Sequence, residues 1–111
     1  MSDLVYLASP YSAPTANKRT RRFKQVCKKA AELMSNGYKV FCPIAHSHPI
    51  EIIGMPKMQT GDWWLQRDFA ILEHCSKMVV YKMQGWDKSY GVKKEIEFAQ
   101  AHDIPIEYLE V

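Results

Sequence analysis

The stretch SYGVKKE, residues 89–95, combines a serine, a glycine and an acid at the start of a predicted helix. The Ser89 hydroxyl and the backbone N–H groups near Gly91 can bind an anion at the positive end of the helix dipole. Glu95 follows more than one helical turn later, about the length of a sugar away. A carboxylate at that distance from an anion is suited to attack an anomeric carbon. The alternative is a serine that only caps the helix and a glutamate that faces solvent.

Tyr6 and Asp68 are two further polar residues in apolar surroundings. Tyr6 lies in the middle of the apolar run LVYLA, residues 4–8. Its hydroxyl therefore needs a polar partner, and an acid in a ligand-binding crevice would serve. Asp68 falls on the same side of its predicted helix as Leu65 and Phe69, which predicts incomplete solvation. The alternative for Tyr6 is an aromatic side chain that only packs in the core.

Histidines and tryptophans supply other candidate ligand contacts. His46 and His48 follow a predicted strand, and with Cys42 as the one soft ligand nearby they are too few for a zinc site. We expect them to contact a phosphate or a sugar hydroxyl, and we expect no metal or organic cofactor. The tryptophans can stack on a base or pack in the core; these are Trp63, Trp64 and Trp86. Neither a G-x-G-x-x-G nor a Walker loop is present, so a dinucleotide or triphosphate site is not indicated.

Apolar runs and helical spacing place these residues in one α/β domain that spans residues 1–111. Buried strands are predicted at residues 4–8, 38–43, 77–83 and 104–110, and amphipathic helices at about 17–37, 62–75 and 91–102. Residues 44–61 contain several Pro and Gly residues and are predicted to be irregular. Alternating strands and helices predict a small parallel sheet with helices on both faces, a three-layer α/β/α arrangement of the flavodoxin or Rossmann-like type.

The predicted strand order is 2-1-3-4, because right-handed crossovers leave few other arrangements. Ligands of such sheets bind beyond the carboxyl ends of the strands, at the point where the order reverses. The loops that arrive there are SPYSAP, residues 9–14, and MQGWDKSYG, residues 83–91. We expect these two loops to face each other across the binding crevice.

The charge distribution indicates an anionic partner. Of the 111 residues 47% are hydrophobic and 24% are charged, and the formal net charge is a mild +3. Residues 18–29, however, contain seven Lys or Arg and no acid, which indicates a phosphorylated small molecule or nucleic acid. The alternative is a solvated helix face. Nucleic acid is the less favoured partner, because no base-stacking strand motif accompanies the basic residues.

The cysteines and the hydropathy pattern indicate the compartment. Three cysteines without C-x-x-C spacing predict neither a disulfide framework nor a zinc knuckle, which fits a reducing compartment. No charged-then-apolar leader precedes the first strand, and no apolar run reaches the length of about 20 residues that spans a membrane. We therefore expect a cytoplasmic protein without a membrane partner.

Three segments resemble the nucleoside 2-deoxyribosyltransferase superfamily, which includes the 2'-deoxynucleoside 5'-monophosphate N-glycosidases. The opening strand of that superfamily, with its Tyr, is similar to VYLASPY (residues 5–11). The helix and strand that carry an Asp are similar to RDFAILEHCSKMVVYKM (67–83), and the segment with the catalytic Glu is similar to SYGVKKEIEFA (89–99). The chain also resembles a group of phage and bacterial proteins that share YLASPYS, PIAHSHPI and GW-x-x-S-x-GV-x-x-E.

The resemblance implies that Glu95 attacks C1' and forms a glycosyl-enzyme, that Tyr6 orients Glu95 and that Asp68 acts at the base. It also implies that Ser89 binds the 5'-phosphate, since it replaces an Asp that contacts the sugar in transferases acting on free nucleosides. A hydroxyl at a helix N-terminus accepts a phosphate where a carboxylate would repel it. The nucleotide hydrolases carry an acid just before the third strand; Ser76 stands there in this chain, which leaves Asp68 or a histidine as general acid.

The expected function is hydrolysis of the N-glycosidic bond of a (deoxy)nucleoside 5'-monophosphate, giving free base and sugar 5-phosphate. The alternatives are a nucleoside deoxyribosyltransferase, which exchanges bases, and a nucleotide-binding or sensing protein without catalysis. The resemblance implies a homo-oligomer, a dimer or tetramer, in which a neighbour completes the site. Contacts with substrate or phosphate are expected at Ser9, Tyr11, Arg19, His46, His48, Trp86, Asp87, Ser89 and Gly91.

Overall fold

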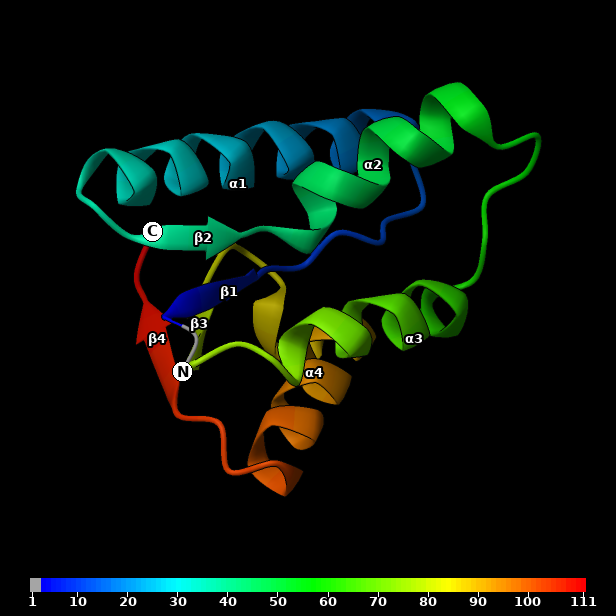
Figure 1. The fold of residues 1–111 in the computed structure, drawn as a ribbon. Helices are drawn as coiled ribbons and strands as arrows, with labels where there is room; N and C mark the ends of the chain where they lie inside the picture. The colour runs from blue at the N-terminus through cyan, green and yellow to red at the C-terminus, as the bar shows by residue number, and fades with distance from the viewer. Residues whose placement is uncertain (1–2) are drawn as a thin grey trace.

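The computed structural model describes residues 3–111, and its centre is a sheet of four parallel strands (Figure 1). The strands are β1 (Leu4–Ala8), β2 (Lys39–Phe41), β3 (Lys77–Tyr81) and β4 (Ile106–Leu109). Their order is β2-β1-β3-β4, and every neighbouring pair is parallel. The predicted order 2-1-3-4 is therefore confirmed. Because β1 and β3 are neighbours at the centre, their carboxyl ends meet at one edge of the sheet.

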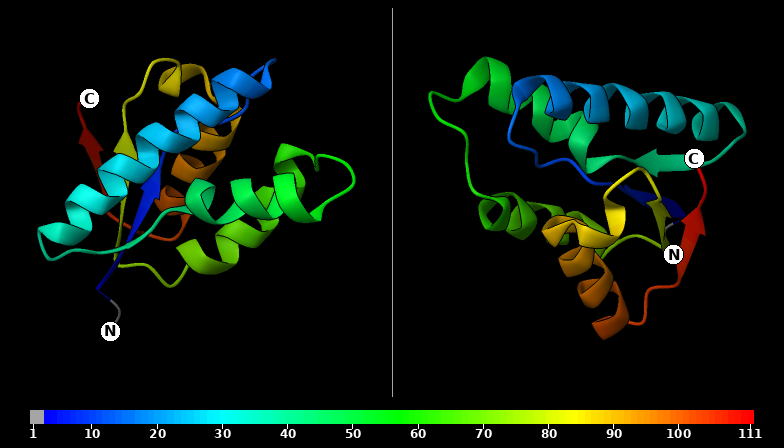
Figure 2. Two further views of the ribbon diagram at one scale, coloured as in Figure 1. Left: turned by 90° about the horizontal axis from the view of Figure 1, so that it is seen from above. Right: turned by 180° about the vertical axis from the view of Figure 1, so that it is seen from behind.

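Helices cover both faces of this sheet (Figure 1 and Figure 2). On one face lie α1 (Ala16–Ser35) and α2 (Pro43–Gly54), and on the other lie α3 (Gly61–Leu72) and α4 (Tyr90–Ala101). A short 3₁₀ helix, η1 (Trp86–Lys88), lies between β3 and α4. The predicted three-layer α/β/α arrangement is confirmed. None of the helices that the structure describes is both long and apolar enough to cross a membrane.

Alternating side chains of β1 divide the core into two apolar clusters. Val5 and Leu7 point to one face, where they pack in a cluster with Val26 of α1. Tyr6 points to the opposite face and packs in a cluster with Val92 of α4. This period-2 alternation is what a strand buried on both faces requires. It places the Tyr6 side chain on the face of the sheet that α4 covers.

The helix α2 corrects the prediction that residues 44–61 are irregular, because only residues 55–60 lack regular structure there. Pro43 stands in the first turn of α2, where its missing N–H costs no hydrogen bond, while Pro49 lies inside the helix. His48 is buried and stacks on Phe23 of α1, with ring centroids 4.2 Å apart. The prediction was wrong because a proline in the first turn is compatible with a helix, and packing against α1 stabilises the turns around Pro49.

The ends of the elements differ slightly from the predicted ones. The strand β2 is shorter than the predicted 38–43. Thr15 and Thr60 accept hydrogen bonds from backbone N–H groups three residues later, so these threonines cap α1 and α3. Ser89 caps α4 in the same way, with its Oγ 3.2 Å from the backbone nitrogen of Val92. The structure therefore shows Ser89 in the capping role that was given as the alternative for this residue, and its Oγ also lines the cavity at the N-terminus of α4.

Candidate active site

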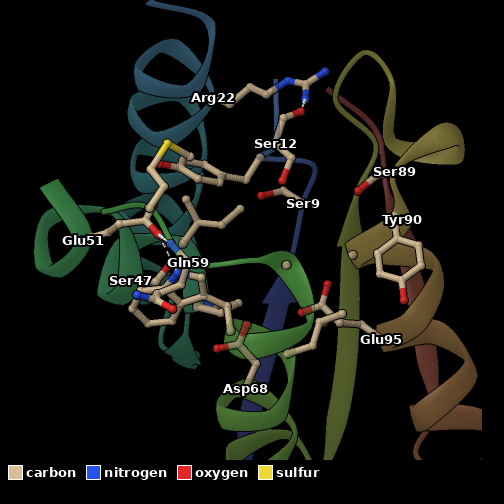
Figure 3. A pocket seen from close by; sticks show the side chains of 18 of the residues that line it. Ser9, Ser12, Arg22, Ser47, Glu51, Gln59, Asp68, Ser89, Tyr90 and Glu95 are labelled. Carbon is tan, nitrogen blue, oxygen red and sulfur yellow. Dashed lines mark hydrogen bonds between the residues drawn. The ribbon is translucent and has the colours of Figure 1, made fainter. Parts of the chain in front are cut away.

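A cavity of about 400 Å³ opens beyond the carboxyl ends of β1 and β3 (Figure 3). Its lining comes from the loop after β1, from all four helices and from the segments that precede α3 and α4. This is the position at which the strand order predicts a ligand-binding crevice. The polar side chains that line the cavity and are labelled in Figure 3 are Ser9, Ser12, Arg22, Ser47, Glu51, Gln59, Asp68, Ser89, Tyr90 and Glu95.

Glu95 is a buried carboxyl group that faces the cavity from α4. The residue is only 5% exposed, yet it belongs to the cavity lining, and Figure 3 shows its carboxyl group pointing into the space. The hydroxyl of Tyr6, which is fully buried in β1, donates a hydrogen bond to Glu95 Oε2. Tyr6 therefore fixes the orientation of the carboxyl group from the sheet. The predicted pairing of these two residues is present in the structure.

Asp68 of α3 is the second acid at this end of the cavity, and Figure 3 shows it below Glu95. Burial raises the pKa of Glu95 to about 8; the hydrogen bond from Tyr6 opposes this shift, and the nearby Asp68 carboxylate adds to it. Burial likewise raises the pKa of Asp68 to about 7. The pKa of Tyr6 lies well above its usual value because of burial and then the charge of Glu95. Near neutral pH the two acids therefore compete for a proton.

Hydroxyl groups and one arginine line the other end of the cavity. Figure 3 shows Ser9, Ser12 and Arg22 at the top and Ser89 at the side, on the far side of Glu95 from Asp68. The Ser9 side chain is 5% exposed, and its Oγ has no hydrogen-bond partner among the described residues. A buried hydroxyl without a partner is costly, so a bound molecule that supplies one is favoured here.

Arg22, rather than the predicted Arg19, is the arginine of the cavity lining. Its guanidinium donates to the carbonyl oxygens of Ser12 (2.8 Å) and Gln84 (3.1 Å), one in each loop of the crevice. The two loops therefore face each other as predicted, and Arg22 joins them. Arg19 instead donates to the carbonyl oxygen of Ala13 at 2.6 Å and does not line the cavity. The signal for Arg22 was its place in the basic stretch, one helical turn after Arg19.

The histidines do not line the cavity. Tyr11 is a lining residue, and its hydroxyl lies 2.6 Å from His48 Nδ1, so His48 supports Tyr11 from behind. Burial lowers the pKa of His48. His46 is exposed and lies near Phe41, with ring centroids 5.8 Å apart. Within residues 3–111, no three His, Cys, Asp or Glu side chains are grouped as a metal site.

The crevice loop before α4 lines the cavity through residues other than the predicted Trp86 and Asp87. Gly85, Lys88 and Gly91 line the cavity together with Ser89, whereas Trp86 and Asp87 do not. Trp86 packs toward Tyr108, with ring centroids 5.7 Å apart, and belongs to the core on the α4 side. Asp87 is exposed. Of the three tryptophans, Trp64 alone lines the cavity in the part of the chain that the structure describes.

Glu51 and Gln59 are lining residues that the sequence did not indicate. Glu51 is buried in α2, and its Oε2 accepts hydrogen bonds from the backbone N–H of Gln59 (2.9 Å) and from Trp64 Nε1 (2.8 Å). Both residues lie in the segment predicted to be irregular, where no helical face could be assigned. Glu51 follows the buried His48 by three residues, a helical spacing that is the one signal available.

Comparison with protein families shows which family the chain belongs to. A family model described as a domain of unknown function (DUF1937) matches residues 3–110. The chain belongs to the DUF1937 family. No curated protein matches it. The match covers every residue of the cavity, so Glu95, Tyr6 and Asp68 lie within the DUF1937 domain itself.

Proposed function

We propose that this DUF1937 protein hydrolyses the N-glycosidic bond of a (deoxy)nucleoside 5'-monophosphate. One observation carries the proposal: a buried glutamate, oriented by a tyrosine hydroxyl, faces a cavity that is also lined by a second, partly buried acid, Asp68. Glycosidic bonds are commonly hydrolysed by two carboxyl groups, one that attacks and one that transfers a proton. The products are a free base and a sugar 5-phosphate.

In the first step, a carboxylate oxygen of Glu95 forms a bond to C1' while the bond from C1' to the base nitrogen breaks. The electron pair of that bond leaves with the base, and Asp68 in its protonated form supplies the proton. Tyr6 donates its hydrogen bond to Glu95 throughout, so it positions the nucleophile. The negative charge of Glu95 also stabilises the positive charge that develops at C1'.

In the second step, water attacks C1' and the ester bond to Glu95 breaks. Asp68, now ionised, takes a proton from the water, so both acids return to their starting states. The net reaction consumes one water and needs neither metal nor organic cofactor. It requires one proton on the acid pair, held by Asp68 in the reactive state. The pKa values of about 8 for Glu95 and about 7 for Asp68 place that proton on Glu95 in the free protein near neutral pH, so the reaction includes transfer of the proton from Glu95 to Asp68 when the substrate binds.

The hydroxyl-rich end of the cavity supports a phosphate on the substrate. Ser89 Oγ and the N-terminus of α4 lie there, together with the buried Ser9 hydroxyl. Arg22 adds the positive charge that a phosphate dianion prefers. A volume of about 400 Å³ falls within the range of roughly 300–1,000 Å³ for small-molecule sites.

The decisive experiment incubates the protein with a panel of ribo- and deoxyribonucleoside 5'-monophosphates and follows base release by chromatography. We expect Glu95→Gln to lower the rate by roughly 1000-fold or more, because it removes the nucleophile. Glu97→Gln, an exposed change in the same helix, is the matched control and should retain the wild-type rate. Base release that is unchanged in Glu95→Gln contradicts the proposal.

A second candidate, nucleotide binding without catalysis, is favoured by one contact. Ser76 stands where nucleotide hydrolases carry an acid, and it is exposed, with its Oγ donating to the Leu4 carbonyl oxygen at 3.2 Å. Ser76 therefore joins the amino ends of β1 and β3 and does not line the cavity. Nucleotide binding without base release from any substrate in the panel supports this second candidate.

The three free thiols are typical of a chain in a reducing compartment, and on this basis we propose a cytoplasmic location.

A further inference from the structure

Glu51 is a buried acid in the cavity that the proposed reaction does not use. It is 5% exposed and lines the cavity from α2. Figure 3 shows Glu51 and Gln59 on the opposite side of the cavity from Ser89 and Glu95, with dashed hydrogen bonds to the Glu51 carboxylate. A nucleotide whose phosphate lies near Ser89 and whose C1' lies near Glu95 would extend its base toward this wall.

The two oxygens of the Glu51 carboxylate have different surroundings. Oε2 accepts two hydrogen bonds, one from the backbone N–H of Gln59 and one from Trp64 Nε1. Oε1 accepts none from the residues that the structure describes. Oε1 is open to the cavity, since Ser9 Oγ is the one buried side-chain polar atom without a hydrogen-bond partner among the described residues. A carboxylate accepts hydrogen bonds at both oxygens. Oε1 is therefore matched to a hydrogen-bond donor on the ligand.

We propose that Glu51 recognises the base and selects one that carries an exocyclic amino group over the counterpart with an oxo group. The inference rests on the proposed function, because it takes the base to lie at the α2 wall. An amino group donates a hydrogen bond to Oε1. A carbonyl oxygen at the same position is an acceptor, like Oε1 itself, so the two oxygens repel each other. Adenine is thus preferred to hypoxanthine, and cytosine to uracil.

Glu51→Gln is a sharp test because the surrounding donors fix the orientation of the new amide. The amide oxygen must occupy the Oε2 position, since two N–H groups point there. The amide nitrogen then occupies the Oε1 position and presents a donor to the cavity. The variant keeps the contacts with Gln59 and Trp64 but reverses the polarity that the base meets.

The experiment measures kcat/KM for two matched pairs of nucleotides: deoxyadenosine with deoxyinosine monophosphate, and deoxycytidine with deoxyuridine monophosphate. We expect the wild type to prefer the amino member of at least one pair by about tenfold or more. Glu51→Gln should abolish or reverse that preference. Glu107→Gln, an exposed change on β4, is the control and should keep the wild-type preference.

Binding measured by calorimetry with the Glu95→Gln variant separates this inference from the proposed function. If the wild type releases no base but nucleotides with an amino group on the base bind more tightly than their oxo counterparts, the proposed function fails and the role of Glu51 stands. Equal kcat/KM within both pairs, or a preference that persists in Glu51→Gln, overturns the inference while the hydrolase proposal survives. No binding of any of the four nucleotides overturns both. If Glu51→Gln does not fold, the preference of the wild type decides.

Discussion

Glu95 places an acid where the surrounding core would otherwise be apolar. It lies beside a fully buried tyrosine in β1 and close to Asp68, and both acids have raised pKa values because they are buried. A buried carboxyl group opposes folding when it ionises, so such a group is usually retained for a role other than stability. The pairing with Tyr6 limits this cost by giving the carboxyl group a hydrogen-bond donor.

The raised pKa of Glu95 predicts how stability depends on pH. Its pKa rises from 4.5 to about 8 on folding, so the folded state holds the proton more tightly than the unfolded state. The stabilisation is complete below the unfolded pKa and is lost as the pH rises through the folded pKa. We expect the free energy of unfolding of the wild type to fall between about pH 4.5 and 8, at up to about 1.4 kcal/mol per pH unit. Glu95→Gln should lose much of this decline, as measured by urea denaturation at several pH values.

The exposed Glu97→Gln serves as the control for this measurement and should follow the wild-type pH dependence. The remaining decline in Glu95→Gln is assigned to Asp68, whose pKa burial also raises. A Glu95→Gln variant with the full wild-type decline would show that the carboxyl group is not buried as described.

At the scale of elements, the site depends on two loops held together by one side chain of α1. Arg22 donates to carbonyl oxygens in both loops. Gly85 lies beside it with a left-handed φ of 89°, and a Cβ added there would lie 2.8 Å from Arg22 Nη2. A side chain at position 85 therefore displaces the guanidinium, which can swing away because it ends a flexible side chain.

Gly85→Ala should raise the KM for nucleotides about tenfold or more, because the displaced Arg22 no longer lies beside the phosphate. Gly37→Ala is the matched control. Gly37 has a similar φ of 96°, a Cβ added there would meet no atom within 4 Å, and it is not part of the cavity lining. Both variants should lose about 1–2 kcal/mol of stability from the left-handed backbone. Steady-state kinetics and thermal denaturation separate the two effects, and equal KM values in both variants would contradict the role of Arg22.

At the scale of the whole molecule, the end of α2 exposes an apolar surface beside the cavity. Figure 1 shows this end of α2 and the following loop extending away from the sheet. Ile53 is 86% exposed, Ile52 is 58% exposed and Met58 is 54% exposed. Met58 also lines the cavity. An exposed apolar cluster of this kind is typical of an interface, and we expect a second copy of the chain to cover it.

Ile53→Asp should therefore convert the expected dimer or tetramer to a monomer, because it places a charge in the interface. Size-exclusion chromatography with light scattering measures the change. Ile71→Asp is the control, since Ile71 is also partly exposed but belongs to α3, and it should leave the oligomer intact. A monomeric wild type at micromolar concentration would contradict this prediction.

Much of the fold could be predicted because each pattern depends on one element and its burial. Alternation in β1 and helical spacing in α4 are local, and the parallel order follows from short right-handed connections. The segment that forms α2 could not be predicted in the same way. Its helix contains Pro49, and the adjacent His48 packs against Phe23, a contact between residues far apart in the sequence that local patterns do not report.

The sequence by itself determined that Glu95 lies in the helix after the crevice loop and that the Tyr6 side chain needs a polar partner. It also determined the order of the strands, which places both at one edge of the sheet. Only the tertiary structure decided that Arg22 rather than Arg19 reaches the cavity and that Glu51 forms its opposite wall. The physical reason is that periodicity reports which face of an element is buried, whereas the opposing groups are set by how helices and loops pack.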